Sequence, residues 1–466
     1  MTRQGRLDSN VIRMAKKRSP WTAHLIEQDR LALDLNPTPT LIHNLYHGQG
    51  TDLRTRTPRG SPCPACKGVR MLCHKTSCPL TAKLYSYLRL KQSLDRTDLD
   101  GSSPPGVFVG RYGYPNVLVG PMVPPVHGDT TLFDLPEAWF GKTMQQIVDY
   151  RFQLVRGQHR ADVRHPDDGG RILDETRFLA MADGSVDVEL TLRDKPRKSF
   201  VLNDEVQPMG PSAHMKDLKS GNFRLDQWIE KAYYDEDQKA AEAVREVYDR
   251  GTPVSKIMKA LSVGAFGTKK RRRLVPTRWS ITAVDSMLSL DMMEKVKQYP
   301  VINEYRVYES TYLDNRFEVI LLPEGWRYEA IEAWYPGTIW NPAGEDIFMF
   351  GDSENRHGRT SYAKMGGCYY AARLAVNELL MRERRQATAI VLREAHPDYI
   401  MPVGVWQVRE NVRNALRNPP LTFSRLDDVL DRLKMKFDIR LATWLGNSTM
   451  LTDAINQTKL SKFFQD

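Results

Sequence analysis

Four cysteines that lie within sixteen residues constrain the fold of this chain more than any other feature of its sequence. Four thiolates this close together can enclose one tetrahedral Zn²⁺ ion, with Zn–S distances of about 2.3 Å and no vacant coordination position. The second pair, Cys73 and Cys78, is spaced more loosely than the usual C-x2-C, and His74, next to Cys73, could replace one thiolate. An iron–sulfur cluster and non-ligating thiols are the alternatives. A closed site is structural, so the pattern predicts a small zinc-binding module rather than a catalytic centre. The pattern is C-x2-C-x6-C-x4-C, formed by Cys63, Cys66, Cys73 and Cys78.

Positive charge is concentrated around these cysteines. The chain holds 67 Lys and Arg residues against 57 Asp and Glu, a net charge of +10. Residues 53–94 contain nine cations and no acidic residue, which leaves about +1 for the rest of the chain. Such a field is typical of a surface that binds a polyanion, nucleic acid first, and a solvated basic face is the alternative. The candidate nucleic-acid contacts in this block are Arg54, Arg56, Arg59, Lys67 and Arg70.

A second basic run lies in the middle of the chain, after a Gly-rich segment. Five adjacent cations repel one another unless water or phosphate surrounds them, so the run predicts an exposed loop that either contacts phosphate or is simply solvated. Nearby, Arg278 and Trp279 offer groups that can stack on a base, although Trp is also a common core residue. The run consists of Lys269, Lys270, Arg271, Arg272 and Arg273.

Residues 456–466 carry the most specific motif of the sequence. Leu460, Phe463 and Phe464 stand at i, i+3 and i+4, so they form one face of a single helical turn, and Gln457 lies one turn earlier. This arrangement is typical of a helix that docks into the groove of a partner. The pattern resembles a PIP box, the peptide by which proteins dock on the sliding clamp PCNA. A chain end that folds back on its own body is the alternative.

Polar side chains crowd residues 351–362, directly before the strongest helical pattern of the chain. Arg356 and Arg359 lie in this segment and could bind a phosphate at the helix start. An acid beside a histidine can perform general acid–base catalysis, and Glu394 and His396, further along the chain, form such a pair in the sequence. Because no Walker A, GxGxxG, HExxH or nucleophile-elbow motif occurs, a hydrolase remains only an open alternative. The candidate catalytic residues are Asp352, Glu354, His357 and Glu394.

Composition excludes several classes of protein. Hydrophobic residues make up 41% and charged residues 27%, which is the balance of a chain that buries a core. No apolar run approaches the ~18 residues that span a bilayer, and the opening MTRQGRLDSN has no apolar signal region. Five cysteines are too few for a disulfide scaffold and indicate a reducing compartment. We therefore expect a cytoplasmic protein without a membrane partner, associated with the nucleoid through DNA.

Apolar periodicity predicts strand runs and helix runs that are clustered rather than alternating, which favours the α+β class. The expected strands are 107–111, 116–119, 187–192, 305–310, 316–322, 327–334, 346–350 and 387–392. The expected helices are 80–94, 135–155, 225–250, 280–296 and 362–385, with a mostly helical tail from 421 that loses its apolar periodicity near 452.

We expect a small N-terminal zinc-binding module on a larger mixed α/β body, followed by a flexible C-terminal tail. The expected ranges are 1–52 for a basic arm and lead-in, 53–100 for the zinc-binding basic module, 101–275 for the N-terminal part of the body, 276–450 for a C-terminal α+β region, and 451–466 for a disordered tail with the PIP-like motif.

Together these features resemble the archaeal Nre family of DNA repair proteins over nearly the whole chain. The resemblance implies a role in DNA repair, zinc held by the four clustered cysteines, and PCNA contacts at Gln457, Leu460, Phe463 and Phe464. It implies no catalytic residue, so a clamp-tethered DNA-binding factor and an enzyme acting on nucleotides or damaged DNA both remain open. The resemblance rests on the cysteines, GRYGYPNVLVGPM at 110–122, MGPSA at 209–213, LVPTRWSITAVD at 274–285, GGCYYAARLAV at 366–376 and the motif at 457–464.

Overall fold

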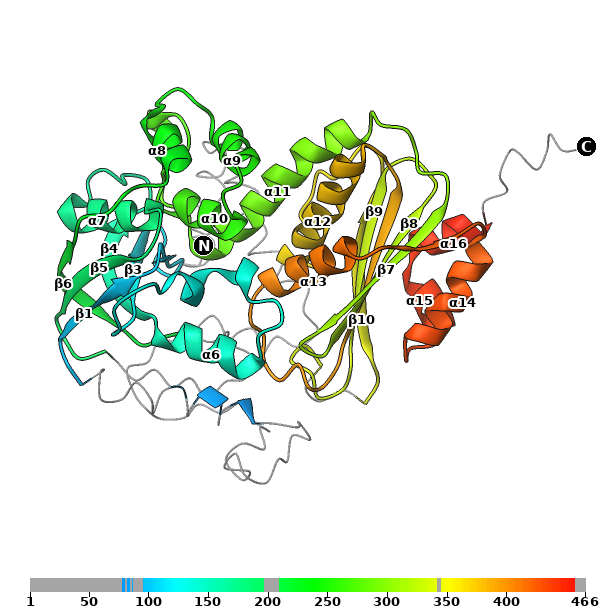
Figure 1. Ribbon diagram of the computed structural model, residues 1–466, viewed down its shortest axis with the longest axis horizontal. Coiled ribbons are helices and arrows are strands. Elements are labelled where there is room, and N and C mark those ends of the chain that lie inside the picture. Colours follow the sequence, from blue (N-terminus) through cyan, green and yellow to red (C-terminus); the bar gives the residue numbers. More distant parts are fainter. Residues whose placement is uncertain are drawn as a thin grey trace, which may run out of the picture.

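Two six-stranded sheets, each covered by helices, make up the body of the protein (Figure 1). The computed structural model describes residues 95–196, 209–341 and 345–456, together with Cys78, Pro79, Ala82, Lys83 and Ser86. The predicted α+β class is confirmed for this body. Apart from Cys78, the predicted zinc ligands lie outside the described residues, as do the PIP-like motif and most of the predicted helix at 80–94, of which Ala82, Lys83 and Ser86 are helical.

The first sheet has the strand order β1-β5-β6-β4-β3-β2, and its pairs are antiparallel except β4 with β6. Side chains alternate along β5, where every second residue is buried, as expected for a strand with one face on a core. Helix α7 (Gly170–Met181) shares a core with β3 and β2. The strands are β1 (Asp98–Ser103), β2 (Val107–Val109), β3 (Asn116–Val123), β4 (Val155–Asp162), β5 (Val186–Leu192) and β6 (Ser212–Ser220).

Helices α8 (Gln227–Tyr234), α9 (Ala240–Asp249) and α10 (Val254–Ser262) follow the first sheet. The predicted single helix over 225–250 is wrong, because the chain breaks between α8 and α9. Asp235 ends the first helix, and its carboxylate accepts backbone N–H bonds from Asp237 and Gln238, which stabilises a turn instead of a continued helix.

The second sheet has the order β10-β9-β11-β8-β7-β12, with only β9 and β11 parallel. Both of its faces are buried: α11, α12 and α13 cover one face and α14, α15 and α16 the other (Figure 1). The strands are β7 (Tyr305–Tyr312), β8 (Asn315–Leu322), β9 (Arg327–Trp334), β10 (Phe348–Glu354), β11 (Thr388–Ala395) and β12 (Leu421–Phe423). The helices are α11 (Thr277–Val296), α12 (Gly367–Glu383), α13 (Trp406–Arg417), α14 (Leu426–Lys436), α15 (Leu441–Asn447) and α16 (Thr449–Asn456).

The two halves share their cores. One apolar cluster joins β2, β3 and α7 of the first half to α10 and α11, and it reaches Leu374 on α12. A second cluster brings Trp139 against Trp406 on α13, with ring centroids 5.1 Å apart in an edge-on contact. Apolar burial of this kind fixes the halves against each other. Within the described residues, no helix is both long and apolar enough to cross a membrane.

Several predicted element ends are wrong, and two of these errors bear on the candidate site. Strand β10 runs to Glu354 and β11 to Ala395, so three of the candidate catalytic residues lie on strands rather than in loops. Residues 451–456 are helical in α16, and 421–423 form a short strand. Strands β4 and β6 and helices α7, α10 and α13 had no counterpart among the expected elements.

Candidate functional site

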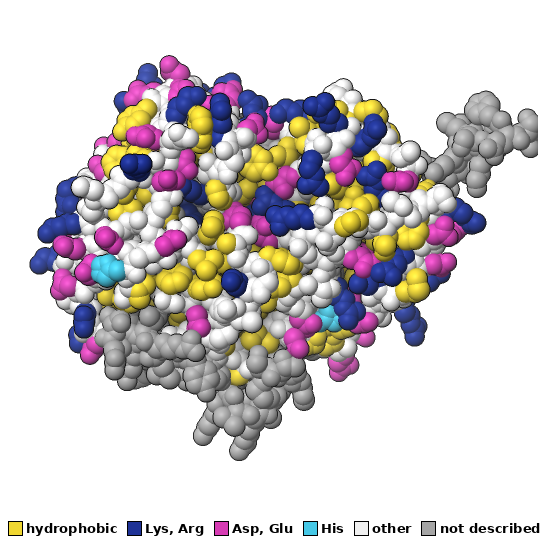
Figure 2. Space-filling view, viewed as in Figure 1, with side chains coloured by type: hydrophobic (Ala, Val, Ile, Leu, Met, Phe, Trp, Pro, Cys, Tyr) yellow, Lys and Arg dark blue, Asp and Glu magenta, His cyan; other side chains and the backbone are white. Residues whose placement is uncertain are grey.

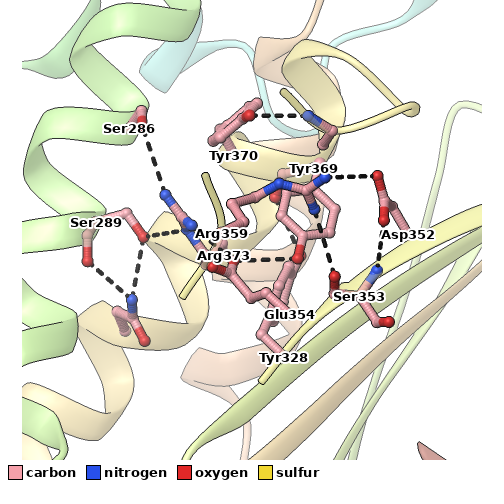
Figure 3. A network of polar contacts seen from close by, with 12 residues as sticks. Ser286, Ser289, Tyr328, Asp352, Ser353, Glu354, Arg359, Tyr369, Tyr370 and Arg373 are labelled. Atoms are coloured by element: carbon pink, nitrogen blue, oxygen red, sulfur yellow. Dashed lines mark hydrogen bonds and ion pairs between the residues drawn. The ribbon is translucent and has the colours of Figure 1, made fainter. Parts of the chain in front are cut away.

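Asp352 and Glu354 lie on the same face of β10, opposite Ala330 and Tyr328 of β9. This face looks toward α12, because Tyr328 and Ala330 share a core with the helix. Figure 3 shows the two carboxylates together with basic and aromatic side chains from the segment before α12 and from α12 itself. The segment singled out from the sequence therefore brings two of its acids to one place.

Glu354 forms an ion pair with Arg373 of α12, at 2.6 Å between Oε1 and Nη1, with side chains 0% and 1% exposed. The Tyr369 hydroxyl donates to the same carboxylate oxygen at 3.1 Å. Arg373 also donates to Ser289 and Ser286 of α11, at 3.0 and 3.4 Å (Figure 3). This network ties a strand and two helices together in the interior, where a paired charge is strongly favoured over a single one.

Asp352 holds the segment before α12 from the other side. It accepts hydrogen bonds from the Arg359 guanidinium at 2.8 Å and from the backbone N–H of Lys364 at 2.7 Å. Arg359 lies over the ring of Tyr369, 4.8 Å from its centroid. Burial is the largest single influence on the pKa of Arg359 and lowers it, but the hydrogen bond with Asp352 and the charge and hydrogen-bond interactions with Asp352 and Tyr369 together raise that pKa above its usual value. Asp352 thus positions this segment, whereas Glu354 is held through Oε1 by Arg373 and Tyr369, and its buried Oε2 has no hydrogen-bond partner among the described residues.

Glu394 does not join them. On β11 it lies on the same face as Leu392 and Ile390, which pack against α14–α16. This face is opposite to the one that carries Asp352 and Glu354. Its carboxylate accepts the backbone N–H of Ile439 and lies 3.2 Å from Nε2 of His396. His357 is exposed. The candidate catalytic residues therefore do not converge on one site.

Glu394, His396 and Asp438 could each offer one metal-ligand atom, and these atoms lie within 4.8 Å of one another. Arg316 already supplies the positive charge there, with Nη1 3.0 Å from Asp438 and 3.9 Å from Glu394. A cavity of about 240 Å³ lies elsewhere, between α9, α11 and α12, and is lined by paired charges such as Arg245. Neither feature includes Asp352 or Glu354, the two candidate acids that lie together on β10.

Three segments that are distant in sequence meet around the first turns of α11. The β2–β3 turn contacts the start of α11, because the N–H of Val109 donates to Oγ1 of Thr277 at 2.9 Å and the rings of Tyr114 and Trp279 lie 5.5 Å apart. Tyr362, in the segment before α12, hydrogen-bonds with Thr282 of α11. In the sequence these segments are far apart, and only their shared aromatic and Arg residues relate them.

Charge at this junction is positive. The segments 110–116, 160–164 and 277–279 carry four cations and one carboxylate. Burial partly opposes ionisation of Asp162, but its hydrogen bond with Arg164 dominates and lowers the pKa to about 2. On the face shown in Figure 2, basic and acidic side chains are interspersed. The cations of the junction are Arg111, Arg160, Arg164 and Arg278.

The central basic run is only partly available to a ligand. Lys269 pairs with Glu236. Arg272 is 8% exposed and donates to the carbonyls of Gly267 and Asp235, at 2.8 and 3.1 Å. Burial lowers the pKa of Arg272. This arginine therefore holds the turn together, which leaves the exposed cations Lys270, Arg271 and Arg273 as candidate phosphate contacts.

Of the four clustered cysteines the structure describes only Cys78, which is half-buried and whose carbonyl accepts the N–H of Ala82 at 3.0 Å. The other predicted metal ligands, the five candidate cations from Arg54 to Arg70 and the PIP-like residues lie outside the described residues.

Comparison with known proteins assigns nearly the whole chain to one group. A family model described as the N-terminal part of archaeal Nre proteins matches residues 72–341, and one for the C-terminal part matches 354–463. The DNA repair protein NreB of Archaeoglobus fulgidus is 42% identical over 84% of this chain and 96% of the relative. The DNA repair proteins NreA of A. fulgidus and of Haloferax volcanii are 36% and 35% identical, over 86% and 78% of this chain and 98% and 88% of their own lengths. No solved structure shows a significant match.

Proposed function

Because the chain belongs to the archaeal Nre family of DNA repair proteins, we propose that it binds DNA directly and docks on the sliding clamp PCNA. The observation that carries the proposal is the identity of 35–42% to three proteins named for DNA repair. A repair factor needs contact with DNA and a route to the sites where DNA is copied or repaired. A location at the nucleoid follows from these two contacts.

DNA binding is assigned to the basic block at 53–94. Nine cations without an acid provide a field that attracts phosphates regardless of base sequence. One Zn²⁺ held by the four cysteines would fix the backbone between these cations, since thiolates are the ligands of closed structural zinc sites. The N-terminal family model begins at residue 72 and so includes Cys73 and Cys78.

DNA affinity of the full-length protein should fall steeply with salt, because each neutralised phosphate releases about 0.7–0.9 counterions. Reversing Arg54, Arg56 and Arg59 to Glu should weaken binding to all sequences alike and lower the logarithmic salt slope by about three. Fluorescence anisotropy between about 50 and 200 mM salt measures both quantities.

The matched control reverses three exposed cations of the body, Lys216, Lys219 and Arg425, and changes the net charge equally. If the two triple variants bind DNA with the same affinity, the basic block is not the DNA contact.

The chain should contain one tightly held zinc ion. Cys66→Ser should release it and leave the C-terminal core folded, because three thiolates do not close the coordination shell. Cys368→Ser, in α12, is the control and should retain the metal. Elemental analysis decides: absence of zinc, or iron accompanied by inorganic sulfide, would contradict the assignment.

Clamp docking is assigned to Gln457, Leu460, Phe463 and Phe464. The C-terminal family model extends to residue 463, so most of this motif belongs to the part of the chain that resembles the family. Helix α16 ends at Asn456, so the motif begins at the next residue. Ile455, near the end of α16, is 44% exposed.

A hydrolase finds no comparable support. Glu354 is buried and paired with Arg373, Asp352 is paired with Arg359, and Glu394 lies on the other face of the sheet. General acid–base catalysis needs groups within reach of one substrate atom. We therefore propose a binding protein without assigning a reaction.

A further inference from the structure

One surface of the body carries both aromatic and cationic side chains. It is formed by the β2–β3 turn, the end of β4 and the first turn of α11. We call it the hairpin platform, and it consists of Arg111, Tyr112, Tyr114, Arg160, Arg278 and Trp279.

We propose that the hairpin platform binds single-stranded DNA, with one unpaired base stacked on Tyr112. This proposal rests on the DNA binding proposed above and names the form of DNA that the body of the protein recognises. It concerns residues other than the basic block at 53–94, so the two contacts can be tested separately.

Tyr112 is 61% exposed, although its ring is large and apolar. An aromatic side chain this exposed contributes little to a core and offers its face to a ligand. The guanidinium of Arg111 lies 5.2 Å from the ring centroid. A planar group is therefore already stacked near this ring, as a base would be. Stacking of this type tolerates any base, because every base has a π-face.

The turn that carries Tyr112 is held in one conformation. Gly113 has φ +80°, and a Cβ at this position would lie 2.9 Å from the carbonyl oxygen of Asn116. The rings of Tyr114 and Trp279 pack 5.5 Å apart and anchor the turn to α11. A stacking ring on such a support loses little conformational entropy on binding.

Cationic side chains also lie near the turn that carries the ring. Nη1 of Arg160 lies 3.8 Å from the position of a Cβ at Gly113, directly beside the turn. Arg278 is exposed, and no carboxylate among the described residues forms an ion pair with it. It also stands at the N-terminus of the 20-residue helix α11, where the helix dipole favours an anion. Asp162, the one acid of the junction, is engaged by Arg164 at 2.7 Å.

These features favour a single strand over a duplex. In a duplex both faces of each base are covered by neighbouring base pairs, so a protein ring stacks only on a base that has left the stack. A partner protein would need apolar or acidic complementarity, whereas the platform offers cations around one exposed ring. Flexible single strands can present a base and its flanking phosphates together.

The test measures binding of the full-length protein to a fluorescent 20-nucleotide oligo-dT strand and to a duplex of equal length, at about 50 mM salt. Tyr112→Ala should weaken binding to the single strand about five- to a hundredfold, the usual effect of removing one stacking ring. Tyr112→Phe keeps the ring and should bind like the wild type. The matched control is Tyr234→Ala on α8, whose side chain is 64% exposed and lies outside the platform.

Each outcome separates the two proposals. If Tyr112→Ala and Tyr234→Ala both bind the single strand like the wild type, while the wild type binds DNA, the platform proposal is wrong and the basic block stands. If Tyr112→Ala weakens single strand and duplex equally, the selectivity for unpaired bases is wrong. If the wild type binds no DNA, DNA binding itself fails and the platform proposal fails with it. A selective loss in Tyr112→Ala, with an unchanged melting temperature, supports the platform.

Discussion

Full-length protein in which Phe463 and Phe464 are both replaced by alanine should show no measurable binding to the PCNA of its own organism. In a docked helical turn the two rings and Leu460 would form the whole apolar face, so the loss of the rings removes the contacts that can displace water from a groove. Ordering about eight residues costs several kcal/mol, which makes even the wild-type contact only roughly micromolar and leaves no reserve. Isothermal titration calorimetry with purified clamp measures the loss.

The control for this experiment lies in the same peptide. Lys459 and Lys462 stand between the motif positions, and their joint replacement by alanine should change clamp affinity less than about fivefold, since charges that stay in contact with water contribute little to binding. Zinc content and DNA affinity should be equal in all three proteins. Equal clamp affinity of the wild type and the Phe double variant would show that this peptide is not the docking site.

Arg373→Met should lower the free energy of unfolding by about 3–5 kcal/mol, the usual cost of leaving a buried charge without its partner. The guanidinium pairs with Glu354 at 2.6 Å, with both side chains essentially unexposed, and also binds Ser289. Once it is removed, the carboxylate keeps only the Tyr369 hydroxyl. Urea titration followed by circular dichroism measures the change.

An exposed pair provides the comparison. Arg425 and Asp427 lie 2.6 Å apart, but both side chains are 70% exposed. Arg425→Met should therefore leave the free energy of unfolding almost unchanged. Adding Glu354→Gln to Arg373→Met should recover part of the lost stability, because it removes the unpaired charge. If Arg373→Met and Arg425→Met unfold at the same urea concentration, the buried network does not stabilise this part of the fold.

Most strands of the second sheet were predictable because apolar, aromatic and β-branched residues recur along them, whereas β12 lay in the expected helical tail. Strands β7, β8 and β9 lie where apolar periodicity placed them. Strands β4 and β6 escaped because they read VRGQHRAD and SAHMKDLKS, with too few apolar residues for a periodic signal. Strand β4 pairs with β3 and β6, and β6 also pairs with β5. These backbone hydrogen bonds stabilise the strand conformation that the residues themselves favour only weakly, so tertiary context overrides propensity.

The candidate site shows the same limit. The sequence grouped Asp352, Glu354 and Arg359 correctly, because they lie within one short segment. It could not separate Glu394 from them, since the face of a strand residue depends on strand ends that were misplaced. It also missed Arg373, a charge within an apolar helix whose partner lies on a distant strand. The aromatic and Arg residues of the hairpin platform likewise come together only in the folded chain.

The interleaved order of the second sheet has a consequence for how this gene can evolve. The two family models divide the chain between residues 341 and 354, yet β11, from the second part, lies between β9 and β8, which belong to the first. A polypeptide split at this junction would leave β8 and β9 without the strand that joins them, and β11 without either neighbour. Lineages that separate these two parts into independent genes should therefore be selected against, and the pair should be inherited as one reading frame.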